Sequence, residues 1–107
     1  MKQVRPRAIA RADVERAIDR YRDEAGADIA LRFIEALEQA YACIGEAPAA
    51  GSPRWSHALN LPGLRSMPLK RFRWRIFYRE FETHVDIWRV LHVRQDIPDW
   101  LSDPDGL

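Results

Sequence analysis

The sequence offers little that could bind a metal or cross-link the chain. Its single cysteine, Cys43, excludes an internal disulfide and is typical of a reducing cytosol. One cysteine and three scattered histidines give no zinc-site spacing. No apolar run approaches the roughly 18 residues of a membrane span, and the charged stretch from Met1 to Arg16 lacks the apolar segment of a secretory signal. The 107 residues therefore predict one cytoplasmic domain, residues 1–107, without a membrane segment, metal or cofactor.

The charge is distributed unevenly along the chain, although the net charge is only +1. Residues 1–53 carry eight basic and nine acidic side chains, whereas residues 54–94 carry nine basic and three acidic ones. Residues 95–107 hold four aspartates and no basic residue. A near-neutral protein with one basic segment usually meets an acidic partner there, either nucleic acid or another protein. A solvated strand face that displays its charges is the other interpretation.

The first half of the sequence has helical periodicity. Gln3 to Ile9 alternates weakly and contains a proline, which predicts an edge strand. From Arg11 to Ala25 and from Asp28 to Ile44, apolar residues recur at three- and four-residue spacing and predict two helices. Because so short a connection at Gly26 separates them, we expect an antiparallel helical hairpin, with Asp28 as the cap of its second helix.

The second half of the sequence has a period of two. The even positions from Phe72 to Tyr78 are apolar and most odd positions are arginine, which predicts a strand with one face on the core. Leu64–Leu69 predicts a preceding strand, Val85–Val93 predicts a central strand, and Asp96 begins a short terminal helix. The order β-α-α-β-β-β with a short C-terminal helix therefore predicts an α+β fold, in which the helical hairpin packs on a small antiparallel sheet.

Three segments carry a resemblance to a known family. They are LPGLRSMPL (Leu61 to Leu69), RWRIFYR (Arg73 to Arg79) and RVLHVRQDIPDWL (Arg89 to Leu101). In this order, after an alanine-rich helical hairpin, they resemble the RelE/ParE toxins of type II toxin–antitoxin systems over almost the whole chain. The resemblance implies a toxin that works without a cofactor and is held inactive by a cognate antitoxin.

The two branches of that family differ in function. RelE-like members are ribosome-dependent ribonucleases that cut messenger RNA, whereas ParE-like members poison DNA gyrase. Cleaving RNA without a metal needs a base, an acid and cations around one phosphate. Of the positions that the RelE pattern uses, Arg75 keeps its residue type, but the strand lysines fall on Ser66 and Pro68, the later arginine falls on Gln95, and no tyrosine follows Tyr78. The resemblance therefore favours the ParE branch, a gyrase-binding toxin with no catalytic centre.

Two other functions stay open. A histidine at the end of the last strand can act as acid or base near neutral pH, and some ribonucleases of the family use a C-terminal histidine. A ribonuclease would therefore use Arg75, Arg89 and His92, although a histidine satisfied by hydrogen bonds at a strand end explains His92 equally simply. A degenerate member that binds its antitoxin without being toxic is the third alternative.

The basic residues of the Arg-rich strand and of the turn before it are the predicted binding surface. They are Lys70, Arg71, Arg73, Arg75 and Arg79. Guanidinium groups suit acidic proteins and nucleic acids alike. The resemblance implies a ParD-like antitoxin as the first occupant, in a hetero-oligomer, and makes direct nucleic-acid binding less favoured. The alternative is a solvated face whose charges pair with the acidic residues of neighbouring strands.

The C-terminal segment supplies the remaining candidates. Trp100 and Leu101 are candidates for gyrase contact, because ParE-like toxins engage their target through this region, but a structural lid on the sheet is as plausible. Arg89 interrupts an otherwise apolar strand, and a buried arginine needs a carboxylate partner. We expect that partner to be Asp96 or a helix glutamate. Trp88 falls out of register with its apolar neighbours and is expected beneath a partner or a loop.

Overall fold

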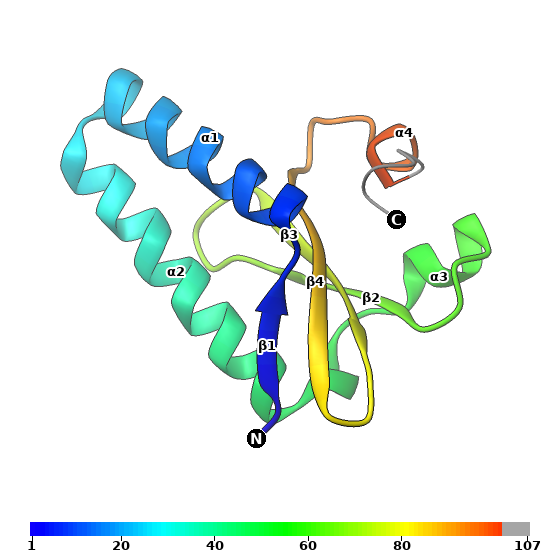
Figure 1. The fold of residues 1–107 in the computed structure, drawn as a ribbon. Coiled ribbons are helices and arrows are strands. Elements are labelled where there is room, and N and C mark those ends of the chain that lie inside the picture. Colours follow the sequence, from blue (N-terminus) through cyan, green and yellow to red (C-terminus); the bar gives the residue numbers. More distant parts are fainter. Residues whose placement is uncertain (102–107) are drawn as a thin grey trace.

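A four-stranded sheet separates a long helical hairpin from two short helices in the computed structural model, which describes residues 1–101 (Figure 1). The elements follow one another as β1 Gln3–Pro6, α1 Ala8–Ala25, α2 Ala27–Glu46, a 3-10 turn Pro48–Ala50, α3 Arg54–Leu59, β2 Leu64–Pro68, β3 Trp74–Glu80, β4 His84–His92 and α4 Ile97–Leu101. The α+β class and the order of the main elements are confirmed. Helix α3 lies in a segment for which the sequence pattern predicted no regular element.

The helical hairpin begins earlier than its periodicity predicted. The Arg7 carbonyl accepts the Arg11 N–H at 3.0 Å, so the first turn of α1 forms ahead of the apolar stripe. Gly26 ends α1 with a φ of 95°, which glycine adopts without a steric penalty, and its N–H donates to the Arg22 carbonyl. The predicted cap, Asp28, lies instead in the first turn of α2, where its charge favours the positive end of the helix dipole.

The strands have the order β1-β4-β3-β2, so β1 is an edge strand and β4 a central one, as predicted. β2, β3 and β4 are antiparallel neighbours, but β1 runs parallel to β4, with Val4 opposite Val85. The sheet is therefore mixed and differs from the antiparallel sheet that the sequence predicted. The long chain between β1 and β4 makes this possible, because a parallel pair needs a crossover connection.

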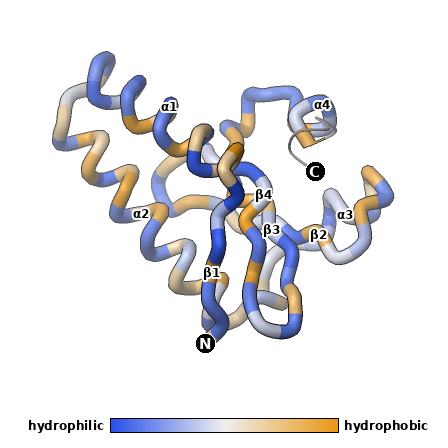
Figure 2. Tube along the Cα trace, in the orientation of Figure 1, coloured by the Kyte–Doolittle hydropathy of each residue, from blue (hydrophilic) through white to orange (hydrophobic). Residues whose placement is uncertain are grey.

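The larger core lies between the helical hairpin and one face of the sheet. Phe33 and Ile44 of α2 are fully buried there with Ile76 of β3 and with Val85 and Ile87 of β4. α2 is the more apolar of the two helices, whereas α1 is mainly hydrophilic (Figure 2). Burial of such side chains stabilises the fold by roughly 1.5–3 kcal/mol each, and this core holds the hairpin on the sheet.

Aromatic rings join the hairpin to the end of the sheet. The Phe33 ring lies 5.5 Å from both Phe72 and Trp74 and 5.2 Å from Tyr21, measured between ring centroids. The indole Nε1 of Trp74 donates to the Tyr21 hydroxyl at 2.9 Å. Trp74 therefore faces the core, as its position in the alternating pattern predicted.

A second, smaller core covers the opposite face of the sheet. Leu64, Phe77 and Leu91 pack there with Leu101 of α4, and all four are fully buried. Trp88 belongs to this core and is only 6% exposed. The register between β3 and β4 shifts at this point, with Phe77 opposite Arg89 and Tyr78 opposite Ile87, so Trp88 has no partner on β3. No helix among the described residues is long and apolar enough to span a membrane.

Gly51 should not tolerate a side chain, because it packs against the Tyr78 hydroxyl. That hydroxyl donates to the Pro48 carbonyl at 2.6 Å, and a Cβ at Gly51 would overlap it. We therefore expect Gly51→Ala to lower the free energy of unfolding by about 1–3 kcal/mol, the usual cost of overpacking. Urea denaturation measures the change, with Ala50→Ser at the exposed neighbouring position as the control. Equal losses in the two variants would contradict this packing.

Candidate functional site

One buried ion pair connects the hairpin to the central strand. Nε and Nη2 of Arg89 donate to Oδ2 and Oδ1 of Asp13 at 2.8 and 2.7 Å, and Arg89 is only 1% exposed. The expectation that Arg89 pairs with Asp96 or a helix glutamate is wrong, since its partner is an aspartate of α1. A buried charge is tolerated when such a partner and further hydrogen bonds satisfy it.

The short β1 strand explains why Asp13 lies beside β4. The backbone contacts between the two strands end where the Arg7 N–H donates to the Ile87 carbonyl at 3.0 Å. Beyond that point α1 runs alongside β4, and the Val90 N–H donates to Asp13 Oδ2 at 3.0 Å. Arg16 adds a further bond to Oδ1 at 2.8 Å. Asp13 thus accepts a backbone hydrogen bond from the part of β4 that β1 does not reach, and it neutralises Arg89.

Arg89 also holds the terminal helix. Its Nη1 donates to the Trp100 carbonyl at 3.1 Å, and its guanidinium carbon lies 5.1 Å from the centroid of the Trp100 ring. Trp100 remains 39% exposed, whereas Leu101 is fully buried in the second core. Of the two residues predicted to contact a target, Trp100 lies on the surface, and Leu101 serves as part of a lid on the sheet.

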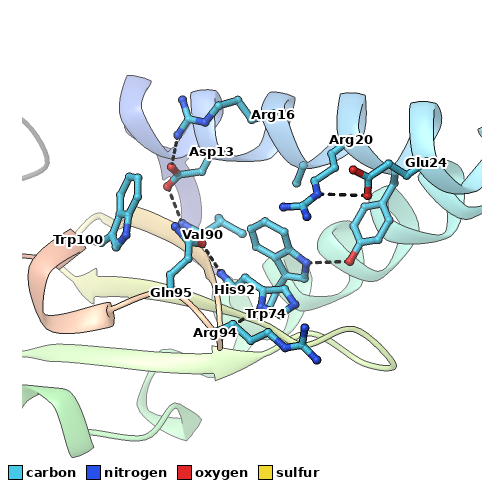
Figure 3. Close-up of a pocket in the computed structure, with 12 residues that line it drawn as sticks. Asp13, Arg16, Arg20, Glu24, Trp74, Val90, His92, Arg94, Gln95 and Trp100 are labelled. Atoms are coloured by element: carbon cyan, nitrogen blue, oxygen red, sulfur yellow. Dashed lines mark hydrogen bonds and ion pairs between the residues drawn. The ribbon is translucent and has the colours of Figure 1, made fainter.

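A cleft of about 690 Å³ lies between α1, the end of β4 and the loop that leads to α4 (Figure 3). We call it the first cleft; its lining is Asp13, Arg16, Ala17, Arg20, Tyr21, Glu24, Trp74, Val90, His92, Arg94, Gln95 and Trp100. Arg16 and Arg20 are paired with Asp13 and Glu24, at 2.8 and 3.3 Å. Arg94 forms no ion pair with the described residues. The volume of the first cleft is in the usual range for a ligand-binding pocket.

His92 lies in the first cleft as a neutral hydrogen-bond acceptor. Its ring is edge-on to Trp74, with 5.3 Å between centroids, and its Nδ1 accepts the Arg94 N–H at 3.1 Å. Burial lowers the pKa of His92 below its ordinary 6.5, and the charges of Arg94, Arg20 and Arg73 lower it further. Among the described residues no carboxylate forms a hydrogen bond or ion pair with this ring, whose Nδ1 accepts the backbone N–H of Arg94.

A second cleft of about 610 Å³ lies on the face of the sheet that α3 and α4 cover. Its lining is Ser52, Arg54, Trp55, Ser66, Arg75, Val93, Gln95, Asp96, Ile97 and Pro98. Nε and Nη2 of Arg75 both donate to the Ser66 hydroxyl, at 3.2 and 3.0 Å. Ser66, Arg75 and Gln95, which the RelE pattern singled out, are therefore neighbours, but Arg75 is the one cation among these three.

Arg54 is a residue of the second cleft that sequence reasoning missed. It begins α3, a helix too short to leave a periodic signal. Burial lowers the pKa of Arg75 from its ordinary value, and the charge of Arg54 lowers it further. Arg54 belongs to the basic segment of residues 54–94, but no sequence motif distinguished it from the other basic residues.

The structure does not bring together the three residues that a ribonuclease would use. Arg75 lines the second cleft and His92 the first, while Arg89 is buried and bound to Asp13 and to the Trp100 carbonyl. Metal-free cleavage requires its acid, base and cations around one phosphate. Among the described residues there is also no group of three or more side chains able to hold a metal ion.

The five predicted binding residues do not share one surface. Lys70 and Arg71 lie in the turn before β3, next to α2, while Arg75 faces the second cleft. Arg73 precedes β3, and the guanidinium of Arg79, at the other end of that strand, lies 5.2 Å from the Phe81 ring centroid. None of the five forms an ion pair with a carboxylate of the described residues.

Two of the three acidic residues that could neutralise them, Glu80, Glu82 and Asp86, pair with other cations. Glu80 pairs with Lys2 at 2.7 Å, and Asp86 pairs with Arg7 at 3.0 Å. Both cations come from the N-terminal segment, so the arginines of β3 stay available for a partner. Cys43 lies exposed on α2.

The comparisons with known proteins agree with this architecture. Residues 4–97 match the family model described as the ParE toxin of the type II toxin–antitoxin system parDE, and the chain belongs to this family. A chain from the chromosomal ParDE toxin–antitoxin system of P. aeruginosa has the same fold, with a TM-score of 0.73 and 22% identity. That match covers 88% of this chain and 98% of the other. No curated protein matches the sequence.

The titration of His92 tests the electrostatics of the first cleft. Because its pKa is lowered in the folded state, the stability that neutral His92 contributes is present above pH 6.5 and is lost as the pH falls through the folded-state value. We expect Arg94→Gln to raise the pKa of His92, since one neighbouring cation is removed. Nuclear magnetic resonance of the ring protons measures it, with Arg5→Gln on β1 as control. An unchanged pKa of His92 in Arg94→Gln would contradict the assignment of Arg94 as one of the charges that lower it.

Proposed function

We propose that this ParE-family protein is a toxin that binds and poisons DNA gyrase without catalysing a reaction. In this proposal a ParD-like antitoxin holds it inactive in a cytoplasmic hetero-oligomer. Membership of the ParE family supports the toxin role and the type of antitoxin. Gyrase as the target rests on the resemblance to the ParE branch.

The separation of Arg75, Arg89 and His92 is the observation that carries a binding mode of action. A ribonuclease built on these residues would need all three at one phosphate, but Arg75 and His92 line different clefts and Arg89 is buried. Arg89 is neutralised by Asp13 and has almost no exposed surface. Among the described residues these three candidates do not meet at one place, which supports a toxin that acts by binding a partner.

Trp100 is the residue that we assign to target contact. Tryptophan and arginine dominate the binding energy of protein interfaces, especially where they are held rigid. Trp100 is 39% exposed, and its carbonyl and ring are both held by Arg89. Arg94 lines the same cleft. An aromatic anchor next to unpaired positive charge is suited to an acidic protein surface.

Expression of the toxin alone in bacteria tests the proposal. DNA cleavage complexes and message integrity would be scored together, for the wild type, for Trp100→Ala and for Phe81→Ala. Phe81 is a matched control, because it is 37% exposed and lies in the β3–β4 turn, away from both clefts. We expect cleavage complexes with intact messages, and at least a tenfold weaker toxicity for Trp100→Ala, the loss typical of a hot-spot residue.

Three results would contradict this function. Cut messages with normal gyrase would support the ribonuclease alternative and make His92 the next residue to substitute. A wild-type protein that is not toxic would support the degenerate member. Equal losses of toxicity in Trp100→Ala and Phe81→Ala would contradict the assignment of Trp100 to target contact.

A further inference from the structure

The second cleft contains two arginines and no carboxylate that neutralises them. Arg75 is half-buried, and its guanidinium bonds to the neutral hydroxyl of Ser66. Arg54 lies over the ring of Trp55, with 5.2 Å between guanidinium carbon and ring centroid. Neither guanidinium forms an ion pair with a carboxylate among residues 1–101. Two like charges in the lining of one cleft, one of them partly desolvated, favour the entry of an anion.

The backbone fixes the two arginines relative to each other. Ser52 and Ser66 exchange backbone hydrogen bonds of 2.8 and 2.9 Å, which attach the start of α3 to the edge of β2. The Ser52 hydroxyl also accepts the Arg54 N–H at 3.2 Å. Arg75 projects from β3, the strand paired with β2. The backbone positions from which the two cations project are therefore preorganised, which lowers the entropic cost of binding a ligand.

The rest of the lining distinguishes between possible anions. Trp55, Val93 and Ile97 give the cleft an apolar wall beside the two cations. Asp96 lies at the same cleft, where its negative charge disfavours a polyanion such as a nucleic-acid backbone. A single carboxylate on an otherwise apolar peptide meets the two arginines and the apolar wall together, without placing further negative charge near Asp96.

We propose that the second cleft is the site for an aspartate or glutamate side chain of an antitoxin peptide segment. The carboxylate would accept hydrogen bonds from Arg54 and Arg75, while apolar neighbours in the peptide would cover Trp55 and Val93. The inference rests on the proposed neutralisation by an antitoxin and names the chemistry by which one segment of it is recognised. The cleft also borders Ile97 and Pro98 of α4, so its occupant lies against the helix that carries Trp100.

Side-chain nuclear magnetic resonance with defined probes tests the site. The toxin, labelled with nitrogen-15, would be titrated with a synthetic peptide that carries one glutamate between apolar residues, with its glutamine counterpart, and with an oligouridylate RNA. The signals followed are the Nε–H groups of Arg54, Arg75 and Trp55. We expect saturable shifts of all three with the glutamate peptide and none with the glutamine peptide or the RNA.

Substitutions complete the test. We expect Arg54→Gln and Arg75→Gln each to weaken binding of the glutamate peptide roughly tenfold or more, the usual loss of a charge-assisted hydrogen bond. Arg5→Gln, an exposed arginine on β1, is the matched control and should bind like the wild type. Ser66→Ala keeps both charges and removes the hydroxyl that orients Arg75. We expect Ser66→Ala to weaken binding of the glutamate peptide less than Arg75→Gln does. This variant still tests the site if Arg75→Gln fails to fold.

Several results would overturn the proposal. They are equal binding of the two peptides, shifts produced by the RNA alone, and a loss in Arg5→Gln as large as that in Arg75→Gln. The titration contains neither gyrase nor antitoxin, so a negative result removes this site and leaves the proposed toxicity standing. Loss of toxicity in Trp100→Ala, conversely, does not bear on the second cleft.

Discussion

The pairing of Asp13 with Arg89 is the constraint on which both faces of the sheet depend. Arg89 is 1% exposed and Asp13 5% exposed, so neither charge would remain there without the other. Asp13 belongs to the helical hairpin and Arg89 to the central strand, and the same guanidinium binds the carbonyl of Trp100 on α4. Because β1 stops short, the Asp13 carboxylate also receives the Val90 N–H. One polar cluster thus positions the hairpin, the strand edge and the terminal helix.

The two clefts lie on either side of the loop between β4 and α4, and Gln95 lines both. The first cleft presents Trp100 beside Arg94, and the second presents Arg54 and Arg75. In the proposed function the first cleft contacts the target, and the second cleft receives an acidic side chain of the antitoxin. Since both border α4, an occupant of the second cleft would lie close to the proposed target contact, which offers a physical route to neutralisation.

Much of the fold could be predicted from sequence, because it is encoded in local periodicity. The alternation around Trp74 placed its side chain in the core, and the compact connection at Gly26 predicted the hairpin. The parallel direction of β1 could not be predicted, since four residues with weak alternation carry no signal of direction. Nor could the partner of Arg89, because Asp13 lies 76 positions away in the sequence. The charge pattern could not show that the residues of the basic segment face different clefts, because the turn before β3 and the packing of α3 separate them.

A double-mutant cycle on Asp13 and Arg89 tests the central claim most directly. The free energy of unfolding would be measured by urea denaturation for Asp13→Asn, Arg89→Met and the double variant. Each single substitution should lose about 3–5 kcal/mol, because it leaves a buried group without its partner. The double variant should lose little more than either single one, since no buried charge then remains unpaired. Losses that simply add across the two positions would contradict the account.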